Sequence, residues 1–547
     1  MSIIRMRKFM QNKLHYVMLG LAIVLGIGMI VVVLPGQFGQ NEQEKMAGLI
    51  ATVNGEKIKR ADFEKEYNEE LERIETQNNR TLTPVEASLF RGTLFDRTME
   101  RVLLMQAAKK AGIRVSKREV KAEITKTIDE VMKNEREQLM AGVKGKKTDK
   151  LYEVRLKEYF NDRTMTPRKR RAMLMKQVSW DDVREQMLMR KLADHWKKSI
   201  DTSDKAIRAS YDEIHALQIT VSSTNRSDVQ AKARVRELVE KIRGGADFAA
   251  IAKQYSEDPF KDKGGDRGAI QRRYVGYLER PLADTLRKLK PGEVSDPVKT
   301  QTGYVILKVN KITSALPPDY EKNRKKYRDE YVNMEESRLN YEKREELRRS
   351  AKVKIYDYEI KAYVDGKDFI PMVVYGGPIS GDSMPKVKKV LSEYQKAADM
   401  AADDSQTAGR VFAVMGYIYD SLRRPGSPVA NEKERLKYRD EAERTLRAAY
   451  DRTGDNEIDL KLVDIYIEKG KYDLAVEELG LISESLQGSD DMRLHDMTMA
   501  ALKKIQASGS PTVAQKAAEI IAQELQWQKA YRESQQPMGG QPLNVTP

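Results

Sequence analysis

Side chains that commonly act as nucleophiles, bases or metal ligands are few and scattered in this sequence. Cysteine is absent, and the four histidines, His15, His195, His215 and His495, lie far apart. Without cysteine the chain has no disulfide, no thiol nucleophile and no Cys-ligated zinc. It also contains no His-Glu-x-x-His, Gly-x-Ser-x-Gly or phosphate-binding loop, so metalloprotease, hydrolase and nucleotide-binding functions lack motif support. We expect no metal and no other cofactor.

Two short segments nevertheless contain residue types that could form a functional site. In EDPFKDKGGDRG, residues 257–268, Asp258 precedes a proline and can cap a turn by bonding the backbone that follows it. The glycines of this segment allow positive φ angles. In TQTGYVILKV, residues 300–309, a turn glycine precedes apolar residues, which predicts a buried strand. His215 lies between apolar residues in another predicted strand, and by itself favours a structural role.

Length and composition predict the framework that carries these segments. At 547 residues the chain exceeds the roughly 250 to 300 residues at which single hydrophobic cores stop growing. Charged residues make up 33% of the chain and aromatic residues 7%, which together with many Lys/Glu-rich periodic stretches indicates a mostly α, multidomain protein. Its net charge is +15, but basic and acidic residues are interleaved, so we expect no nucleic-acid partner.

The N-terminus predicts membrane anchoring. Residues 17–34 form an uninterrupted apolar run, long enough to cross a bilayer core of about 30 Å as a helix. Residues 1–16 contain basic but no acidic residues, which places them in the cytoplasm by the positive-inside rule. We predict a single-pass inner-membrane protein with its bulk on the periplasmic, extracytoplasmic side. A cleaved signal peptide is the alternative, although no A-x-A site follows the run.

Residues 46–210 are predicted to be helical after a short strand and a turn at Asn54-Gly55. Ser116 followed by Glu119 predicts a capping box at a helix start. Methionines concentrate between residues 173 and 189. They are expected to fill helix cores, or alternatively to form an adaptable apolar surface for varied peptides.

The rest of the chain divides into four parts. Residues 211–313 predict a compact α+β domain with the order β-α-α-α-β-β. Residues 316–360 predict a long charged helix and a strand that return to the first helices, because those helices lack a complete core. Residues 390–533 predict weakly repeated helix pairs that stack as a solenoid, and residues 534–547 a disordered tail.

Several motifs together carry a family resemblance. The segment YSEDPFKDKGGDRG, with DFAAIAKQYS before it and LKPGEVSDPVKTQTGYVILKV after it, resembles the parvulin-type peptidyl-prolyl isomerases. Upstream, ATVNGEKIKRADFEKEY resembles the N-terminal helical chaperone domain of the SurA and PpiD type. The resemblance covers residues 17–355. The C-terminal helix pairs resemble tetratricopeptide repeats and lie outside that pattern.

The resemblance implies a set of site residues. Catalytic roles fall on His215 in the first strand, Asp258 in the glycine-rich loop and Thr302 before the last-strand glycine. The family's second histidine corresponds to Val305. The apolar cup for the proline ring, which in the family commonly has Met and Phe, corresponds to Leu278 and Leu282, with Val305 beside them.

The resulting hypothesis is a membrane-anchored periplasmic chaperone that binds unfolded or nascent exported polypeptides, with a parvulin domain of weak or lost isomerase activity. One alternative is an active prolyl isomerase in which His215, Asp258 and Thr302 suffice. Another is a scaffold in which the C-terminal repeats dock a protein partner of an envelope or secretion complex.

Overall fold

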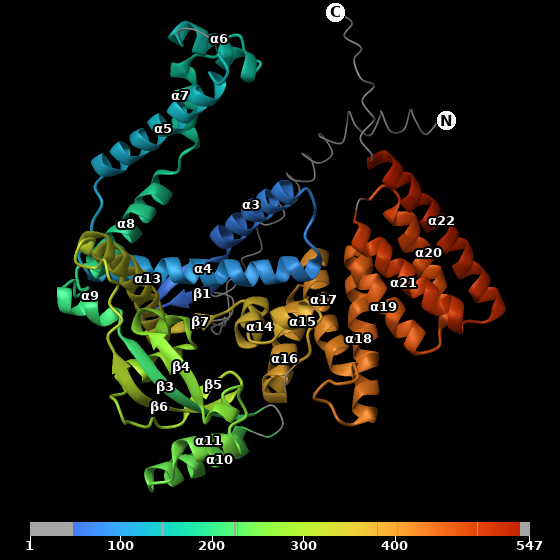
Figure 1. The fold of residues 1–547 in the computed structure, drawn as a ribbon. Helices are drawn as coiled ribbons and strands as arrows, with labels where there is room; N and C mark the ends of the chain where they lie inside the picture. Colours follow the sequence, from blue (N-terminus) through green and yellow to red (C-terminus); the bar gives the residue numbers. More distant parts are fainter. Residues whose placement is uncertain are drawn as a thin grey trace, which may run out of the picture.

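The computed structural model describes residues 48–535 except 144–146, 224, 225, 227, 380, 402 and 490. It is mostly helical, with two small β-sheets (Figure 1). The predicted cytoplasmic segment, the predicted membrane span of residues 17–34 and nearly all of the predicted tail lie outside the described residues. Within the described residues, no helix is long and apolar enough to cross a membrane.

The N-terminal lobe is built around a three-stranded sheet in the order β2-β1-β7. Asn54 and Gly55 have positive φ angles of 51° and 87° and turn β1 into β2. β7 follows β1 by some 300 positions in sequence, yet its residues pair antiparallel with β1, so the chain returns to this lobe. The elements are β1 (Leu49–Val53), β2 (Glu56–Lys59), α3 (Arg60–Asn78), α4 (Pro84–Lys110), α13 (Arg324–Ser350) and β7 (Val353–Ile355).

A helical arm extends away from this lobe (Figure 1). It begins at α5, where Ser116 and Glu119 form the expected capping box. Met187 is buried in the arm with Met175 packed against the same cluster, so these methionines fill a helix core, whereas Met173 is 37% exposed. The arm and the helix that follows it comprise α5 (Lys117–Leu139), α6 (Asp149–Tyr159), α7 (Pro167–Gln177), α8 (Trp180–Lys197) and α9 (Asp204–Ser210).

Residues 213–313 form a separate α+β unit around a four-stranded antiparallel sheet in the order β4-β3-β6-β5. The expected glycine-rich loop continues into a strand, β4, that the sequence reading missed, so the order is β-α-α-β-α-β-β. Helices α10 and α11 pack on one sheet face and α12 on the other. The elements are β3 (Glu213–Ser222), α10 (Asp228–Arg243), α11 (Phe248–Tyr255), β4 (Asp266–Gln271), α12 (Arg280–Lys288), β5 (Val298–Thr300) and β6 (Gly303–Thr313).

The C-terminal part is entirely helical. The strand predicted to run to residue 360 stops at Ile355, because Asp357 caps a new helix, α14, by accepting the Ile360 N–H. The bulky and small residues that suggested repeats mark close helix contacts: a Cβ on Gly416 would lie 2.5 Å from Leu446. Successive helices from α17 to α22 pack against one another; their assignment to the tetratricopeptide family stays a prediction.

These helices are α14 (Tyr358–Gly366), α15 (Ile370–Val374), α16 (Met384–Met400), α17 (Ser405–Arg423), α18 (Glu432–Thr453), α19 (Asn456–Glu468), α20 (Tyr472–Leu486), α21 (Met492–Ser508) and α22 (Pro511–Gln535).

A buried ionic network joins the N-terminal lobe to these helices. Arg91 on α4 pairs with Asp357 at 2.9 Å and with Glu359 at 3.1 Å. Arg410 on α17 binds the same Glu359 at 2.9 Å. All four side chains are nearly inaccessible to solvent. The C-terminal helices are therefore packed into the lobe.

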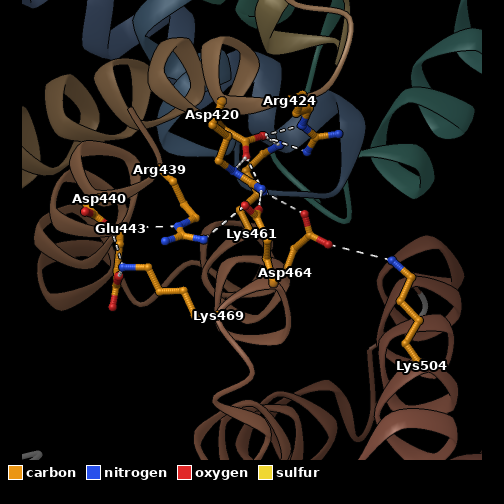
Figure 2. Close-up of polar contacts among 11 residues, drawn as sticks. Asp420, Arg424, Arg439, Asp440, Glu443, Lys461, Asp464, Lys469 and Lys504 are labelled. Atoms are coloured by element: carbon orange, nitrogen blue, oxygen red, sulfur yellow. Dashed lines mark hydrogen bonds and ion pairs between the residues drawn. The ribbon is translucent and has the colours of Figure 1, made fainter. Parts of the chain in front are cut away.

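A second network links the C-terminal helices to one another (Figure 2). Asp420 on α17 is buried and binds Arg424 at 2.7 Å and Lys461 of α19 at 3.4 Å. Burial opposes its ionisation, but these cations and Arg423 hold the pKa of Asp420 below its usual value. Arg423 also binds Asp464 of α19. Such cross-helix pairs fix the orientation of neighbouring helices.

Candidate active site

The polar centre of the α+β unit is the carboxylate of Asp258, which follows α11. Its Oδ2 accepts hydrogen bonds from the Thr220 hydroxyl at 2.7 Å and the Gln218 amide at 3.2 Å. Its Oδ1 accepts the backbone N–H of Phe260 at 2.9 Å. Asp258 therefore caps the turn, as the sequence predicts, and also belongs to a polar cluster.

Gln218 and Thr220 belong to the α12 face of the sheet. Thr220 pairs with Val305 across the β3–β6 ladder, and Gln218 pairs with Leu307. Val305 and Leu307 both pack in the cluster that includes α12. Because side chains alternate between faces along a strand, this polar pair borders the same apolar surface as Val305.

His215 lies elsewhere on β3. Its Nε2 is 3.1 Å from the Thr313 hydroxyl, and its strand partners are Lys311 and Ala269. The structure thus brings Asp258 to Gln218 and Thr220 rather than to His215. Three positions separate His215 from Gln218, and a register shift follows His215 in both ladders. The catalytic role expected for His215 stays a prediction.

The three residues expected to form the apolar cup do come together. Leu282 and Val305 are buried in one hydrophobic cluster, and the partly buried Leu278 packs against it. Proline at the second position of α12 and the turn before it set the direction of this helix over the sheet. The cup is aliphatic throughout and offers no aromatic face to a proline ring.

Thr302 is exposed in the turn between β5 and β6. Its carbonyl accepts the Ser223 N–H at 2.9 Å. The neighbouring Thr300 is buried instead, and its hydroxyl donates to the Gly303 carbonyl at 3.2 Å. Gly303 itself is required sterically, because an added Cβ would lie 2.2 Å from the Val221 carbonyl oxygen.

Sequence reasoning missed Gln218, Thr220 and Arg267. Arg267 on β4 donates from Nη1 to the Gln218 Oε1 at 2.7 Å. A signal for Gln218 and Thr220 was available: pairing Gly303 with the end of β3 places Thr220 opposite Val305, and Gln218 two residues away on the same face. Arg267 had no comparable signal, because β4 was read as a loop.

This arrangement leaves few polar groups free to act on a prolyl amide. The barrier to prolyl rotation comes from amide resonance, and an enzyme can lower it by gripping the proline and favouring the twisted amide, without a nucleophile. Here the amide and carboxylate groups bond mainly one another: the Gln218 amide nitrogen binds Asp258 and Thr220, and its oxygen binds Arg267. A bound prolyl amide would have to compete for these groups.

Comparisons with known proteins identify two modules. A SurA-like N-terminal domain matches residues 6–138, and a PPIC-type PPIase domain matches residues 215–311. The chain therefore contains a SurA-like N-terminal module and a PPIC-type module. Both modules agree with the resemblance read from the sequence, whereas the C-terminal helices stay without a family assignment.

Among curated proteins, foldase protein PrsA of Caldanaerobacter subterraneus subsp. tengcongensis is 26% identical over 335 residues, covering 59% of this chain and 92% of that protein. Foldase protein PrsA of Bacillus subtilis is 32% identical over 169 residues, covering 30% of this chain and 53% of that protein. This match spans about half the length of the Bacillus subtilis protein.

Among solved structures, the crystal structure of peptidylprolyl isomerase PrsA from Bacillus cereus is 20% identical and covers 59% of this chain and 98% of that chain, with a TM-score of 0.22. A crystal structure of a PpiC-type peptidyl-prolyl cis-trans isomerase domain is 29% identical and covers 19% of this chain and 95% of that chain, with a TM-score of 0.18.

Proposed function

We propose that this protein is a membrane-anchored chaperone that holds unfolded exported polypeptides, with a PPIC-type domain whose isomerase activity is weak or lost. The observation that carries the second part is the pairing of Gln218 with Asp258 beside Val305, which leaves no imidazole in the cluster. The three residues expected to form the apolar cup pack in one hydrophobic cluster on the same face. A domain with this site can still bind prolyl segments.

Two surfaces support the holding function. The arm exposes large apolar side chains, among them Tyr159 at 67% and Val154 at 48%. A cavity of about 1230 Å³ lies between the α3–α4 turn and the ends of the C-terminal helices, with Leu71, Leu82 and Leu494 in its lining. Mixed apolar and polar linings of this kind suit extended polypeptides, which present both side chains and backbone groups.

The location is part of the proposal. The apolar run of residues 17–34 would anchor the chain in the inner membrane, with residues 1–16 in the cytoplasm and the described residues on the periplasmic side. The foldase names of the sequence relatives fit a protein that meets polypeptides as they fold. The clients would accordingly be exported polypeptides before they reach their native state.

The test compares two activities of the full chain in detergent. Aggregation suppression is measured on a denatured client protein, and isomerase turnover is measured on a proline tetrapeptide. We expect clear suppression and little turnover. Robust turnover by the unmodified chain would refute the weakened site and favour the active-isomerase alternative, and absence of suppression would favour the scaffold alternative.

A gain-of-function variant sharpens this test. Gln218→His combined with Val305→His places two imidazoles on the α12 face beside Asp258, and we expect turnover to rise by at least tenfold. Val229→His is the matched control, because Val229 is 77% exposed on α10 and remote from the cluster. If turnover is the same in the double variant and the control, missing imidazoles do not limit this site.

One observation supports the scaffold alternative. A cleft of about 380 Å³ between α17, α18 and α19 is lined by Leu436 and Ile467, with Arg435 and Glu468 at its edge. A protein partner could dock there without contact with the α+β unit. Docking and client holding are compatible functions, so this surface adds to the proposal rather than replacing it.

A further inference from the structure

Arg267 is a half-buried cation without a matching anion. On the sheet edge strand β4, its guanidinium donates one hydrogen bond, to the neutral Gln218, and lies 5.8 Å from the centroid of the Phe260 ring. Among the residues the structure describes, no carboxylate forms an ion pair with it. Burial lowers the pKa of Arg267, and the charge of Asp258 opposes that shift.

The cluster around Asp258 has free hydrogen-bond donors, but its carboxylate is already satisfied. The Asp258 carboxylate already accepts from Thr220, Gln218 and the Phe260 backbone. A guanidinium carries five N–H donors in a planar fork, and only one of those on Arg267 has an acceptor here. The remaining nitrogens of Arg267 are not buried. The site therefore has spare donors for an incoming acceptor and a carboxylate that needs no further donor.

The position of Arg267 relative to the cup gives these donors a use. Gln218, its partner, lies across the ladder from Leu307, two residues from Val305 in the cup. A segment whose proline entered the cup would run along the sheet edge past this guanidinium. A carboxylate fits a guanidinium with two parallel hydrogen bonds, whereas a neutral amide gains less and an ammonium is repelled.

We propose that Arg267 is a specificity residue that selects polypeptide segments with an acidic residue beside the proline. This inference rests on the proposed function, because it assumes that the PPIC-type domain binds prolyl segments of clients. It requires no isomerase turnover. It assigns to the domain a ligand class, acidic prolyl segments.

Binding of fluorescent peptides to the full chain in detergent tests the inference. The peptides share one sequence and differ at a single position beside the proline, on either side: Glu, the isosteric Gln, or Lys. We expect Glu to bind about tenfold more tightly than Gln, as one charge-assisted bidentate pair allows, and Lys to bind most weakly. The preference should shrink as salt is raised.

Variants separate this role from a structural one. Arg267→Gln should abolish the preference for Glu over Gln, and Arg267→Lys should retain part of it. Arg234→Gln is the matched control: Arg234 is also half-buried over an aromatic ring, Tyr255, but lies on α10 on the opposite sheet face. This control should keep the full preference. Melting temperatures of all variants verify that the fold is intact.

Three results would overturn the inference: equal affinity for Glu and Gln peptides, a preference that persists in Arg267→Gln, or no prolyl-peptide binding at all. Aggregation suppression by the unmodified chain is measured in parallel. Suppression without an acidic preference would leave the proposed function standing and refute Arg267 as a selector. An acidic preference without suppression would refute the chaperone proposal alone.

Discussion

Replacing Arg91 with methionine probes how firmly the C-terminal helices are joined to the N-terminal lobe. Arg91 is 3% exposed and pairs with Asp357, Glu359 and Glu64 at 2.9, 3.1 and 2.7 Å. Methionine is unbranched and can fill the space of the aliphatic part of the arginine side chain, which limits the cavity left behind. The main cost is the uncompensated negative charge of the buried carboxylates.

The expected loss of stability depends on which ion-pair partners Asp357 and Glu359 keep. Removing one member of a buried ion pair typically costs about 3 to 5 kcal/mol. Here Arg60 still binds Asp357 at 2.7 Å, and Arg410 still binds Glu359 at 2.9 Å. We therefore expect a loss near the low end, about 3 kcal/mol. In hydrogen exchange this equals about a hundredfold loss of amide protection in the cooperative unit that contains α4 and α17.

The pH of the measurement is chosen from the state of Asp357. Burial opposes its ionisation, but Arg91 and Arg60 lower the pKa of Asp357 to about 2. A depressed carboxyl pKa stabilises the fold above the unfolded pKa near 4, and the contribution is lost as pH falls toward 2. Exchange is accordingly measured near pH 7, where the contribution is complete. Adding Asp357→Asn to Arg91→Met should recover part of the loss, because it removes one orphaned charge.

Arg97→Met is the matched control, since Arg97 lies on the same helix, carries the same charge and is exposed. We expect it to change stability by less than about 0.5 kcal/mol. A loss below about 1 kcal/mol for Arg91→Met, or protection that falls in α4 but not in α17, would refute the idea that this network joins the lobe to the C-terminal helices.

Two further predictions concern single residues. Asp459 on α19 is fully buried. Burial, with Glu478 nearby, raises its pKa to about 6, and Arg447 and Tyr450 only partly oppose that shift. A raised carboxyl pKa favours the folded state at low pH, so stability should fall by up to about 3 kcal/mol as pH rises from 4 to 8. Asp459→Asn should flatten that slope in urea unfolding, and an unchanged slope would contradict the assignment. Gly303→Ala should destabilise the α+β unit by at least about 2 kcal/mol, because its Cβ would overlap the Val221 carbonyl. Gly48→Ala, where a Cβ meets nothing, is the control, and equal melting temperatures for the two variants would refute the steric argument.

The sequence predicted a structural feature correctly where the residues that form it lie close together in the chain. The Asn54-Gly55 turn and the capping box of Ser116 and Glu119 depend on residues within a few positions of one another, and both are present in the structure. The two family modules were likewise readable, because their motifs follow one another in order along the chain. Predictions failed where a long-range partner decides the outcome. Residues 266–271 form a strand only because β3 lies beside them.

The site shows where sequence reasoning ends. The residue types of the site, namely a loop carboxylate, a valine in the last strand and leucines near α12, were determined by the sequence alone. Which β3 residue meets Asp258 was decided by the antiparallel register with β6, together with the irregularity that follows His215. Since side chains alternate between the two faces of a strand, an odd offset in register moves a residue to the other face. Asp258 therefore meets Gln218 rather than His215, and Arg267, on a strand that the sequence did not predict, joins them only in the folded sheet.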